Sequence, residues 1–492
     1  MEQAHFRCRL SALSSPLPHV WEHTVGSCHA PLALRADWQQ QLRRCHDELG
    51  FQYVRFHGLL CDDVGTLMRS GDELIYSFFN ADRIVDFLRS IGMRPFVELS
   101  FMPRALASGE DTVFSYRGNI TPPSDYRQWA ELIRRLAQHW VERYGVEEVR
   151  RWYFEVWNEP NLSIFWSGTQ DQYFELYRHT AEAIKSVDGA LRVGGPTTAA
   201  NAWLPEFRNF CQRRKVPVDF LSTHHYPNDP VWSEAQDAES QLAASKRGIL
   251  REMACEACRH AGDLPLLYTE WNASSNLRYP RQDEPYAAAF AAKTALEVSD
   301  LVKAYAFWTF SDIFEESYFP SLPFHGGFGL LTLHGIPKPV YRAFELLHRL
   351  GEERLPIEGA HATVDAWVTR QRDNLIVLLT NHNLPRQPIT AQRVHLELLD
   401  VPPPQRATVE RIDDNHANAK AAWQAMGEPE YLNKTQVRQL EEASGLVVES
   451  QPWHYEGRTA HFEVEMPPHA VAALTIELSE PRTQRSGVSG SP

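Results

Sequence analysis

The stretch that decides the fold is EVWNEPNL, at residues 155–162. Its apolar and aromatic residues predict a buried strand, and Glu159-Pro160 ends that strand on a carboxylate followed by a loop. A second stretch, LYTEWN at residues 267–272, repeats this arrangement around Glu270. Carboxylates at the carboxyl ends of strands are typical of a (β/α)8 barrel, which keeps its chemistry at that end.

Short β-rich runs alternate with amphipathic helical patterns over most of the chain. The predicted strands are residues 20–26, 53–57, 95–100, 152–157, 191–195, 220–226, 266–270 and 304–310. The predicted helices are residues 38–49, 81–91, 124–144, 170–187, 204–214, 238–261, 286–299 and 341–349. This alternation predicts a (β/α)8 TIM barrel over residues 15–352. A doubly wound sheet would also alternate, but no glycine-rich phosphate-binding sequence follows the first strand.

The pattern changes after Pro356, where strand-like alternation replaces the helices. Alternating runs at residues 362–369, 374–379, 394–399, 460–464 and 470–478 predict a C-terminal antiparallel β-sandwich over residues 353–480. Residues 6–10 alternate in the same way, so an N-terminal strand within residues 5–13 is expected to join this sandwich. Residues 481–492 are rich in Ser, Gly, Arg and Pro and are predicted to form a disordered tail.

Composition argues against two classes of partner. The chain of 492 residues carries a net charge of −14, whereas nucleic acids and anionic membranes require a basic face. No run reaches the roughly 18 apolar residues that span a membrane. The N-terminus MEQAHFRCRL lacks a basic segment followed by an apolar core, which predicts a cytoplasmic protein, or a periplasmic one if a leader was removed. Self-association is left open.

The seven cysteines show no regular framework spacing. An odd number without a framework predicts free thiols in a reducing compartment. Cys255 and Cys258 have the spacing of a redox or zinc pair, but they lie within a helical pattern and lack a second pair. We therefore expect neither a metal nor a cofactor.

The two strand-end glutamates are the groups that a glycosidase needs. One protonates the leaving oxygen of the glycosidic bond, and the other attacks the sugar carbon. Glu159 alone would more often be a solvated loop residue, and Glu270 could form a salt bridge inside the barrel. However, burying an unpaired carboxylate is costly, and the presence of both residues at strand ends favours catalysis.

These segments resemble glycoside hydrolase family 39, which contains β-xylosidases and α-L-iduronidases. Besides the two glutamate segments, the matching motifs follow in family order: VGS at residues 25–27, RFHG at 55–58, THHYP at 223–227, FWTFSD at 307–312 and HGGFGL at 325–330. The resemblance covers residues 21 to about 345. It implies a retaining (β/α)8 hydrolase followed by a β-sandwich.

The resemblance also implies roles for the residues of the reaction centre. Glu159 would be the acid/base and Glu270 the nucleophile. Asn158 would hold the 2-hydroxyl of the sugar, and His57 would contact other hydroxyls. The charge on Glu270 would raise the pKa of Glu159 and keep it protonated in the free enzyme.

The remaining predicted contacts lie at later strand ends. His225 and Tyr226 close the sixth strand, and one of them is expected to touch the sugar or to orient Glu270. Trp308 would form the floor under the sugar ring. Glu315 or its neighbour Glu316 would bind the outer hydroxyls, and Glu315 is the residue we assign.

The predicted substrate is a neutral pentose. Residues 223–227, 269–272 and 308–312 contain no Arg or Lys to bind a uronate carboxylate. The long loops at 103–123 and 315–339 predict a pocket that accepts chain ends. The sequence thus predicts a retaining β-xylosidase acting on xylobiose and short xylo-oligosaccharides, with a role in xylan degradation. An α-L-arabinosidase, an α-L-iduronidase and a non-catalytic saccharide-binding protein are the alternatives.

Overall fold

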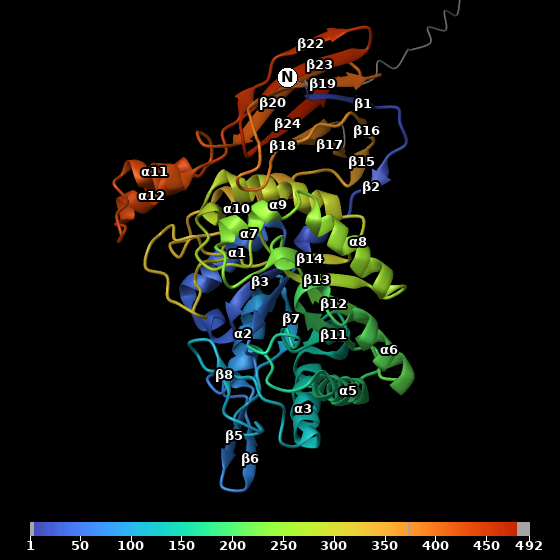
Figure 1. Cartoon of the computed structure of the whole chain (residues 1–492), viewed down its shortest axis with the longest axis vertical. Helices are drawn as coiled ribbons and strands as arrows, with labels where there is room; N and C mark the ends of the chain where they lie inside the picture. The colour runs from blue at the N-terminus through green and yellow to red at the C-terminus, as the bar shows by residue number, and fades with distance from the viewer. Residues whose placement is uncertain (1–3, 372–373, 480–492) are drawn as a thin grey trace, which may run out of the picture.

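Within the described residues, eight parallel strands close into a barrel that helices surround (Figure 1). The structure is a computed structural model and describes residues 4–371 and 374–479. The barrel strands are β3 (Thr24–His29), β4 (Tyr53–His57), β7 (Arg94–Leu99), β10 (Tyr153–Val156), β11 (Arg192–Thr198), β12 (Phe220–His224), β13 (Leu266–Trp271) and β14 (Ala304–Phe307). Each strand pairs in parallel with its neighbours, and β7 closes onto β10. The predicted (β/α)8 barrel is confirmed.

The helices that follow these strands bury an apolar face against the barrel. They are α1 (Ala36–Leu49), α2 (Phe79–Ser90), α3 (Tyr126–Tyr144), α4 (Val146–Val149), α5 (Gln170–Val187), α6 (Leu204–Arg214), α7 (Ala238–Ala244), α8 (Ile249–Ala261), α9 (Pro285–Val298) and α10 (Pro339–His348). Two short hairpins extend the loops at the carboxyl ends of the strands: β5 (Leu67–Ser70) with β6 (Glu73–Tyr76), and β8 (Thr112–Val113) with β9 (Gly118–Asn119). None of the described helices combines the length and apolar composition needed to cross a membrane.

Two predicted boundaries are wrong. The predicted strand at 20–26 is a short 3-10 helix at Val20–Glu22 followed by β3, because Val20 and Trp21 are both buried in one turn instead of alternating. The predicted helix at 238–261 is split into α7 and α8. Ser245 ends α7 and donates a hydrogen bond to the carbonyl of Pro227, and Arg247 donates to the carbonyl of His382 in the second domain at 2.8 Å.

The second domain is a two-sheet sandwich. Its strands are β1 (Ala4–Arg9), β2 (Ser15–Pro16), β15 (Glu353–Leu355), β16 (Ile357–Glu358), β17 (Val364–Gln371), β18 (Asn374–Asn381), β19 (Gln392–Leu399), β20 (Pro404–Ile412), β21 (Glu449–Ser450), β22 (Trp453–Glu456), β23 (Thr459–Met466) and β24 (Ala470–Leu478). The outer sheet has the order β16-β1-β19-β23-β22, and the inner sheet the order β2-β15-β17-β18-β24-β20-β21.

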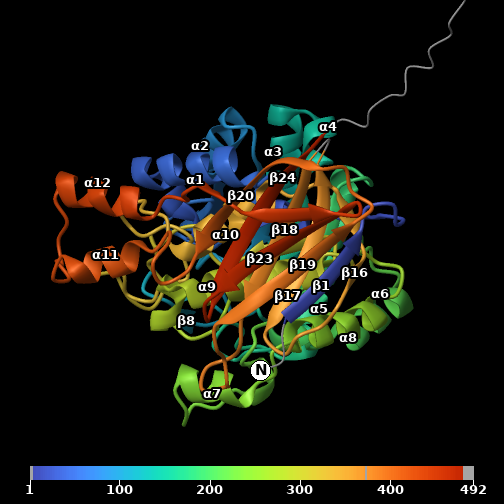
Figure 2. The ribbon, with the colours of Figure 1, turned by 90° about the horizontal axis from the view of Figure 1, so that it is seen from above.

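The sandwich is antiparallel at every described strand pair except one. The N-terminal strand β1 pairs in parallel with β19. It is the strand of the outer sheet that precedes the barrel in the sequence. Two helices that the alternation does not predict, α11 (Ala419–Ala425) and α12 (Lys434–Ala443), lie between β20 and β21. They project to one side of the sandwich in Figure 2. The predicted tail at 481–492 lies outside the described residues.

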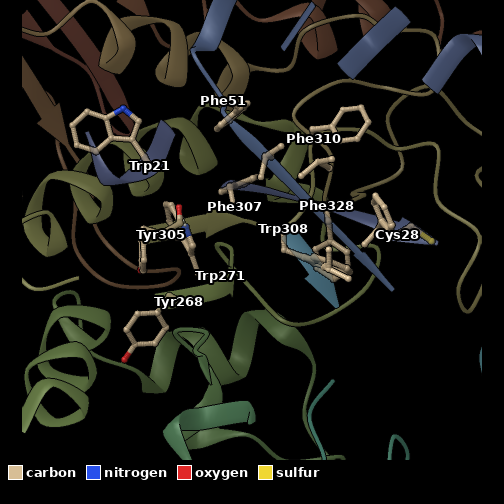
Figure 3. Close-up of a cluster of buried hydrophobic side chains, with 14 of the residues drawn as sticks. Trp21, Cys28, Phe51, Tyr268, Trp271, Tyr305, Phe307, Trp308, Phe310 and Phe328 are labelled. Atoms are coloured by element: carbon tan, nitrogen blue, oxygen red, sulfur yellow. Dashed lines mark hydrogen bonds between the residues drawn. The ribbon is translucent and has the colours of Figure 1, made fainter. Parts of the chain in front are cut away.

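The inner sheet packs directly on the barrel helices. Helix α9 lies below the sandwich in Figure 1, and nearly all of its residues are buried. Trp367, Leu378 and Val471 of the inner sheet belong to the same apolar core as the barrel. In this core, part of which Figure 3 shows, the rings of Trp271 and Tyr305 stack with centroids 4.2 Å apart. The barrel-facing side of the inner sheet therefore shares the barrel core, and the residues between the two sheets form a separate apolar cluster.

Candidate active site

Layers of side chains fill the barrel, because alternate residues of each strand point inward. The lowest layer is apolar and contains Tyr53, Phe96, Tyr153, Phe220 and Leu267. Two residues further along these strands, the inward positions are polar and fully buried: they are Arg55, Glu98, Glu155, Ser222 and Thr269. The carboxyl ends of the strands lie directly above this second layer, and they carry the predicted site.

Arg55 connects the polar layer to the site. Its guanidinium forms ion pairs with Glu155 at 2.5 Å, Glu98 at 2.7 Å and Glu270 at 2.8 Å. It also donates to Oδ1 of Asn158 at 3.0 Å. Burial by itself would lower the pKa of Arg55, but the surrounding carboxylates raise it, so the residue is a permanent cation. We did not predict this role, although a lone Arg inside an otherwise uncharged strand is a signal that could have indicated it.

Glu159 and Glu270 lie on either side of His224. Their nearest carboxylate oxygens and a nitrogen of His224 lie within 4.8 Å of one another. His224 Nδ1 is 2.9 Å from Oε1 of Glu159 and 3.6 Å from Oε2 of Glu270. Both glutamates are more than nine-tenths buried, with exposed fractions of 8% and 5%. Two strand ends 111 residues apart in sequence thus bring two carboxyl groups into one enclosed place.

Two local backbone features direct these glutamates inward. Trp157 and Glu159 adopt positive φ angles of 74° and 44°, an uncommon conformation that clusters at functional sites. The pairing of β12 with β13 shifts register between Thr223 and His224. This irregularity allows both Thr269 and Glu270 to reach His224, although successive residues of a regular strand point to opposite faces.

His225 is not in the site, and this assignment was wrong. Its Nε2 lies 2.7 Å from the hydroxyl of Tyr305, and its ring stacks on Tyr268 at 3.8 Å. Both tyrosines lie on barrel strands, β13 and β14, but their side chains belong to the apolar core between the barrel and its helices. His224 points into the barrel instead, on the same strand face as Phe220 and Ser222. The predicted neighbour Tyr226 does orient Glu270, because its hydroxyl donates to Oε2 at 3.0 Å.

A chain of hydrogen bonds fixes the proton positions around Glu159. The hydroxyl of Thr269 donates to Glu155 at 2.8 Å, so toward His224 it can only accept, from Nε2 at 3.1 Å. Burial lowers the pKa of His224 to about 4, so the ring is neutral and carries its single proton on Nε2. Nδ1 then presents a lone pair to Glu159, and the 2.9 Å contact is a hydrogen bond only when Glu159 is protonated.

The pKa of Glu159 agrees with this arrangement. Burial raises it from 4.5 to about 7, against the lowering effect of His57 and Arg55. The pKa of Glu159 shifts upward, as expected, but the main cause of the shift is different. Desolvation is the main cause, and the carboxylate that contributes is Glu98 instead of Glu270.

His57 and Trp308 lie side by side, with ring centroids 4.7 Å apart. His57 Nδ1 lies 2.7 Å from Glu98, and Nε2 lies 3.7 Å from both Glu270 and Glu316. Burial would lower the pKa of His57, but the carboxylates of Glu98, Glu316 and Glu270 raise it to about 9. The ring is therefore a cation at neutral pH: Nδ1–H donates to Glu98, whereas Nε2–H is beyond hydrogen-bond distance of both Glu270 and Glu316 and can donate to a ligand.

Glu316 is the glutamate that faces the site. It is buried, and burial raises its pKa to about 8, so its carboxyl group is protonated at neutral pH. Glu315, which we had assigned, is partly exposed and forms an ion pair with Arg35 at 2.9 Å. Neighbouring residues point in different directions here, and the structure assigns the buried position to Glu316.

Two long loops enclose the site on one side. The backbone N–H of Ser115 donates to the carbonyl of Glu316 at 2.6 Å and so joins the loop at 103–123 to the loop at 315–339. Phe114 stacks against His57, with centroids 6.0 Å apart. A hollow of about 730 Å³ lies elsewhere, on the outer sheet beside Trp453. Neither Glu159 nor Glu270 lines this hollow. The chemistry of the side chains therefore favours the barrel mouth as the reaction centre.

Glu159, His224 and Glu270 also have the spacing of a metal-binding group. Several of their donor atoms, however, already have protein partners. Both oxygens of Glu270 accept hydrogen bonds, from Arg55 and from Tyr226, and Nδ1 of His224 faces Glu159. This donor set does not fit a resident cation, and it does fit two carboxyl groups prepared for different roles.

Comparison with known proteins agrees with this geometry. The family model described as glycosyl hydrolases family 39 matches residues 7–460. A β-xylosidase from Caldicellulosiruptor saccharolyticus is 50% identical over 93% of this chain and 95% of its own length. A β-xylosidase from Geobacillus stearothermophilus is 37% identical over 93% of this chain and 92% of its own.

A solved structure and a more distant relative complete the comparison. The crystal structure of a family 39 enzyme from Xanthomonas axonopodis pv. citri has a TM-score of 0.86 at 32% identity, over 97% of this chain and 98% of that one. Human α-L-iduronidase is 25% identical over 88% of this chain and 72% of its own. On the family model and the identities together, this chain belongs to glycosyl hydrolases family 39.

Proposed function

We propose that this glycoside hydrolase is a retaining β-xylosidase that removes xylose from the non-reducing end of short xylo-oligosaccharides. The observation that carries the proposal is the unequal environment of two neighbouring carboxyl groups. Glu159 is kept protonated by burial, whereas Glu270 accepts from Arg55 at 2.8 Å and from Tyr226 at 3.0 Å. Such a pair supplies an acid and a nucleophile at one pH.

In the first step, the carboxylate of Glu270 attacks the anomeric carbon while Glu159 gives its proton to the leaving oxygen. With carboxylate oxygens within 4.8 Å, no water fits between the nucleophile and the sugar, so a covalent glycosyl-enzyme forms. In the second step, Glu159 takes a proton from water, whose oxygen attacks the same carbon and releases Glu270. Two inversions give net retention of configuration.

Three neighbours support the sugar in this proposal. Asn158 has its Oδ1 bound to Arg55 at 3.0 Å, which leaves its amide N–H groups to donate to the 2-hydroxyl. Charged His57 donates from Nε2 to a hydroxyl of the same ring. Trp308 provides the apolar floor, and protonated Glu316 hydrogen-bonds the outer hydroxyls.

The proposed substrate is a neutral pentose at a chain end. Arg55 is the cation nearest the glutamates, but all its contacts are with Glu98, Glu155, Glu270 and Asn158. It is therefore not available to a uronate carboxylate, and His57, a second buried cation of the site, is balanced by Glu98 at 2.7 Å. The bond between Ser115 and Glu316 closes one side of the mouth, which suits a terminal sugar better than the middle of a polymer.

The test is a panel of p-nitrophenyl glycosides. We expect the β-D-xyloside to have the highest kcat/KM, and the β-D-glucoside to be slower by roughly 10- to 200-fold, because a steric wall against one extra carbon is worth only about 1–3 kcal/mol. The α-L-arabinofuranoside is expected to give weak activity. A preference for the α-L-iduronide would refute the argument from Arg55, and no turnover of any glycoside would favour a saccharide-binding protein.

A further inference from the structure

His29, Cys61 and Asp63 form a second cluster of donor atoms at the carboxyl ends of the strands. His29 ends β3, and the other two residues lie in the loop between β4 and β5. The imidazole nitrogen, the sulfur and a carboxylate oxygen lie within 4.8 Å of one another. His29 and Cys61 are each 4% exposed, whereas the Asp63 side chain is 42% exposed. The cluster thus has a buried nitrogen and sulfur, and its carboxylate faces solvent.

The contact between His29 and Asp63 is close but is not a hydrogen bond. Nε2 lies 3.1 Å from Oδ2, yet this buried nitrogen has no hydrogen-bond partner among the described residues. The ring cannot easily turn to improve the angle, because it stacks on Tyr116 with centroids 3.6 Å apart and planes 6° from parallel. Two light atoms that share a tetrahedral Zn²⁺ at about 2.0–2.2 Å each lie about 3.3–3.6 Å apart, so a small opening of this contact would let both atoms reach one ion.

Gly58 leaves the space between the two buried donors open. A Cβ at this position would lie 3.0 Å from the sulfur of Cys61 and 3.6 Å from Nε2 of His29. The residue has a φ of +72°, a conformation that glycine adopts without strain. Any side chain here would fill the volume that an ion needs to contact both donors.

We propose that His29, Cys61 and Asp63 bind a thiophilic divalent transition-metal ion, with Zn²⁺ the best fit. One sulfur, one imidazole nitrogen and one carboxylate oxygen make a donor set that zinc prefers, and the exposed side of Asp63 leaves a fourth position for water. On binding, the thiol of Cys61 forms a bond to the metal and its proton passes to solvent. The ion would connect the end of β3 to the β4–β5 loop.

This site is separate from the proposed reaction centre. Tyr116 stacks on His29 and packs against Phe114 with centroids 5.4 Å apart, and Phe114 in turn contacts His57. We therefore expect the ion to be structural: it would stabilise the wall of the pocket and take no part in glycoside cleavage.

The test is a titration of the full chain with Co²⁺, which gives a thiolate-to-cobalt charge-transfer absorption only when a cysteine is a ligand. An ion at Glu159 and Glu270 would not produce this band. Cys255 and Cys258 are partly exposed on α8, so both are first changed to Ser to remove a competing thiol pair. We expect one Co²⁺ per chain with the band, displaced by Zn²⁺.

The variants assign the ligands. Cys61→Ser should abolish the band, and Asp63→Asn, at a partly exposed position that folding tolerates, should weaken Co²⁺ binding at least tenfold. Cys211→Ser, at another buried cysteine on α6, is the matched control and should keep the band. Circular dichroism checks that each variant is folded. The proposal is overturned if no Co²⁺ band forms, if it survives Cys61→Ser, or if Asp63→Asn binds as tightly as its parent.

Discussion

Replacing His224 with Phe should move the alkaline limb of the activity profile to lower pH. The phenyl ring keeps most of the buried volume but removes Nδ1, which accepts from Glu159 at 2.9 Å. Because neutral His224 holds its proton on Nε2, that bond exists only while Glu159 is protonated. Losing this hydrogen bond destabilises the protonated form of Glu159. The carboxylate form does not make the bond and is not destabilised, so the pKa of Glu159 falls.

The magnitude follows from the strength of one hydrogen bond. A net contribution of about 0.5–1.5 kcal/mol corresponds to roughly 0.4–1.1 pKa units at 1.36 kcal/mol per unit. The wild-type limb should lie near the pKa of Glu159, about 7, and the limb of the variant below it. Above both values the active, protonated fraction falls tenfold per pH unit. At about pH 8 the variant should therefore lose roughly 2- to 12-fold more of its plateau activity than the wild type loses.

The assay is kcat/KM for p-nitrophenyl β-D-xyloside between about pH 5 and about pH 9, because this parameter reports the free enzyme. Thr269→Ser keeps the hydroxyl that accepts from Nε2 of His224 and serves as the control, with no change in the limb. An alkaline limb that stays in place or rises in His224→Phe would refute the assigned proton positions. It would mean that Nδ1 carries the proton and favours the carboxylate of Glu159.

Three further predictions concern the roles of Glu159 and Glu270, the choice between Glu316 and Glu315, and the dependence of the barrel on the second domain. Glu270→Ala with added azide should yield an inverted glycosyl azide, and Glu159→Ala a retained one with activated leaving groups partly spared; near wild-type turnover in both variants would contradict the assigned roles. Glu316→Gln should keep a neutral hydrogen-bonding group and alter KM for the xyloside by less than Glu316→Ala, whereas Glu315→Gln should leave KM unchanged; the opposite order would return the contact to Glu315. Removing residues 353–492 should give insoluble protein, because the inner sheet and the barrel share one core; a soluble, active fragment would show that the sandwich is independent.

The sequence by itself determined the features that depend on local order along the chain. Alternating strand and helix patterns predicted the barrel, and the change in pattern after Pro356 predicted the sandwich. Glu159 and Glu270 were identifiable because each follows a buried strand and precedes a loop. The family resemblance supplied their neighbours Asn158 and Tyr226. These signals are contained in a few consecutive residues, so no tertiary information is needed to detect them.

Only the tertiary structure decided which of two adjacent side chains faces the site. Alternation along β12 gives His224 and His225 opposite faces, but the sequence does not say which face is the interior. The pairing of β12 with β13, and the register shift between them, makes that choice. Loop contacts similarly direct Glu316 inward and Glu315 toward Arg35. The ion pairs of Arg55 arise only when the four strands β4, β7, β10 and β13 come together in one barrel, because contacts between strands are set by pairing and not by sequence spacing.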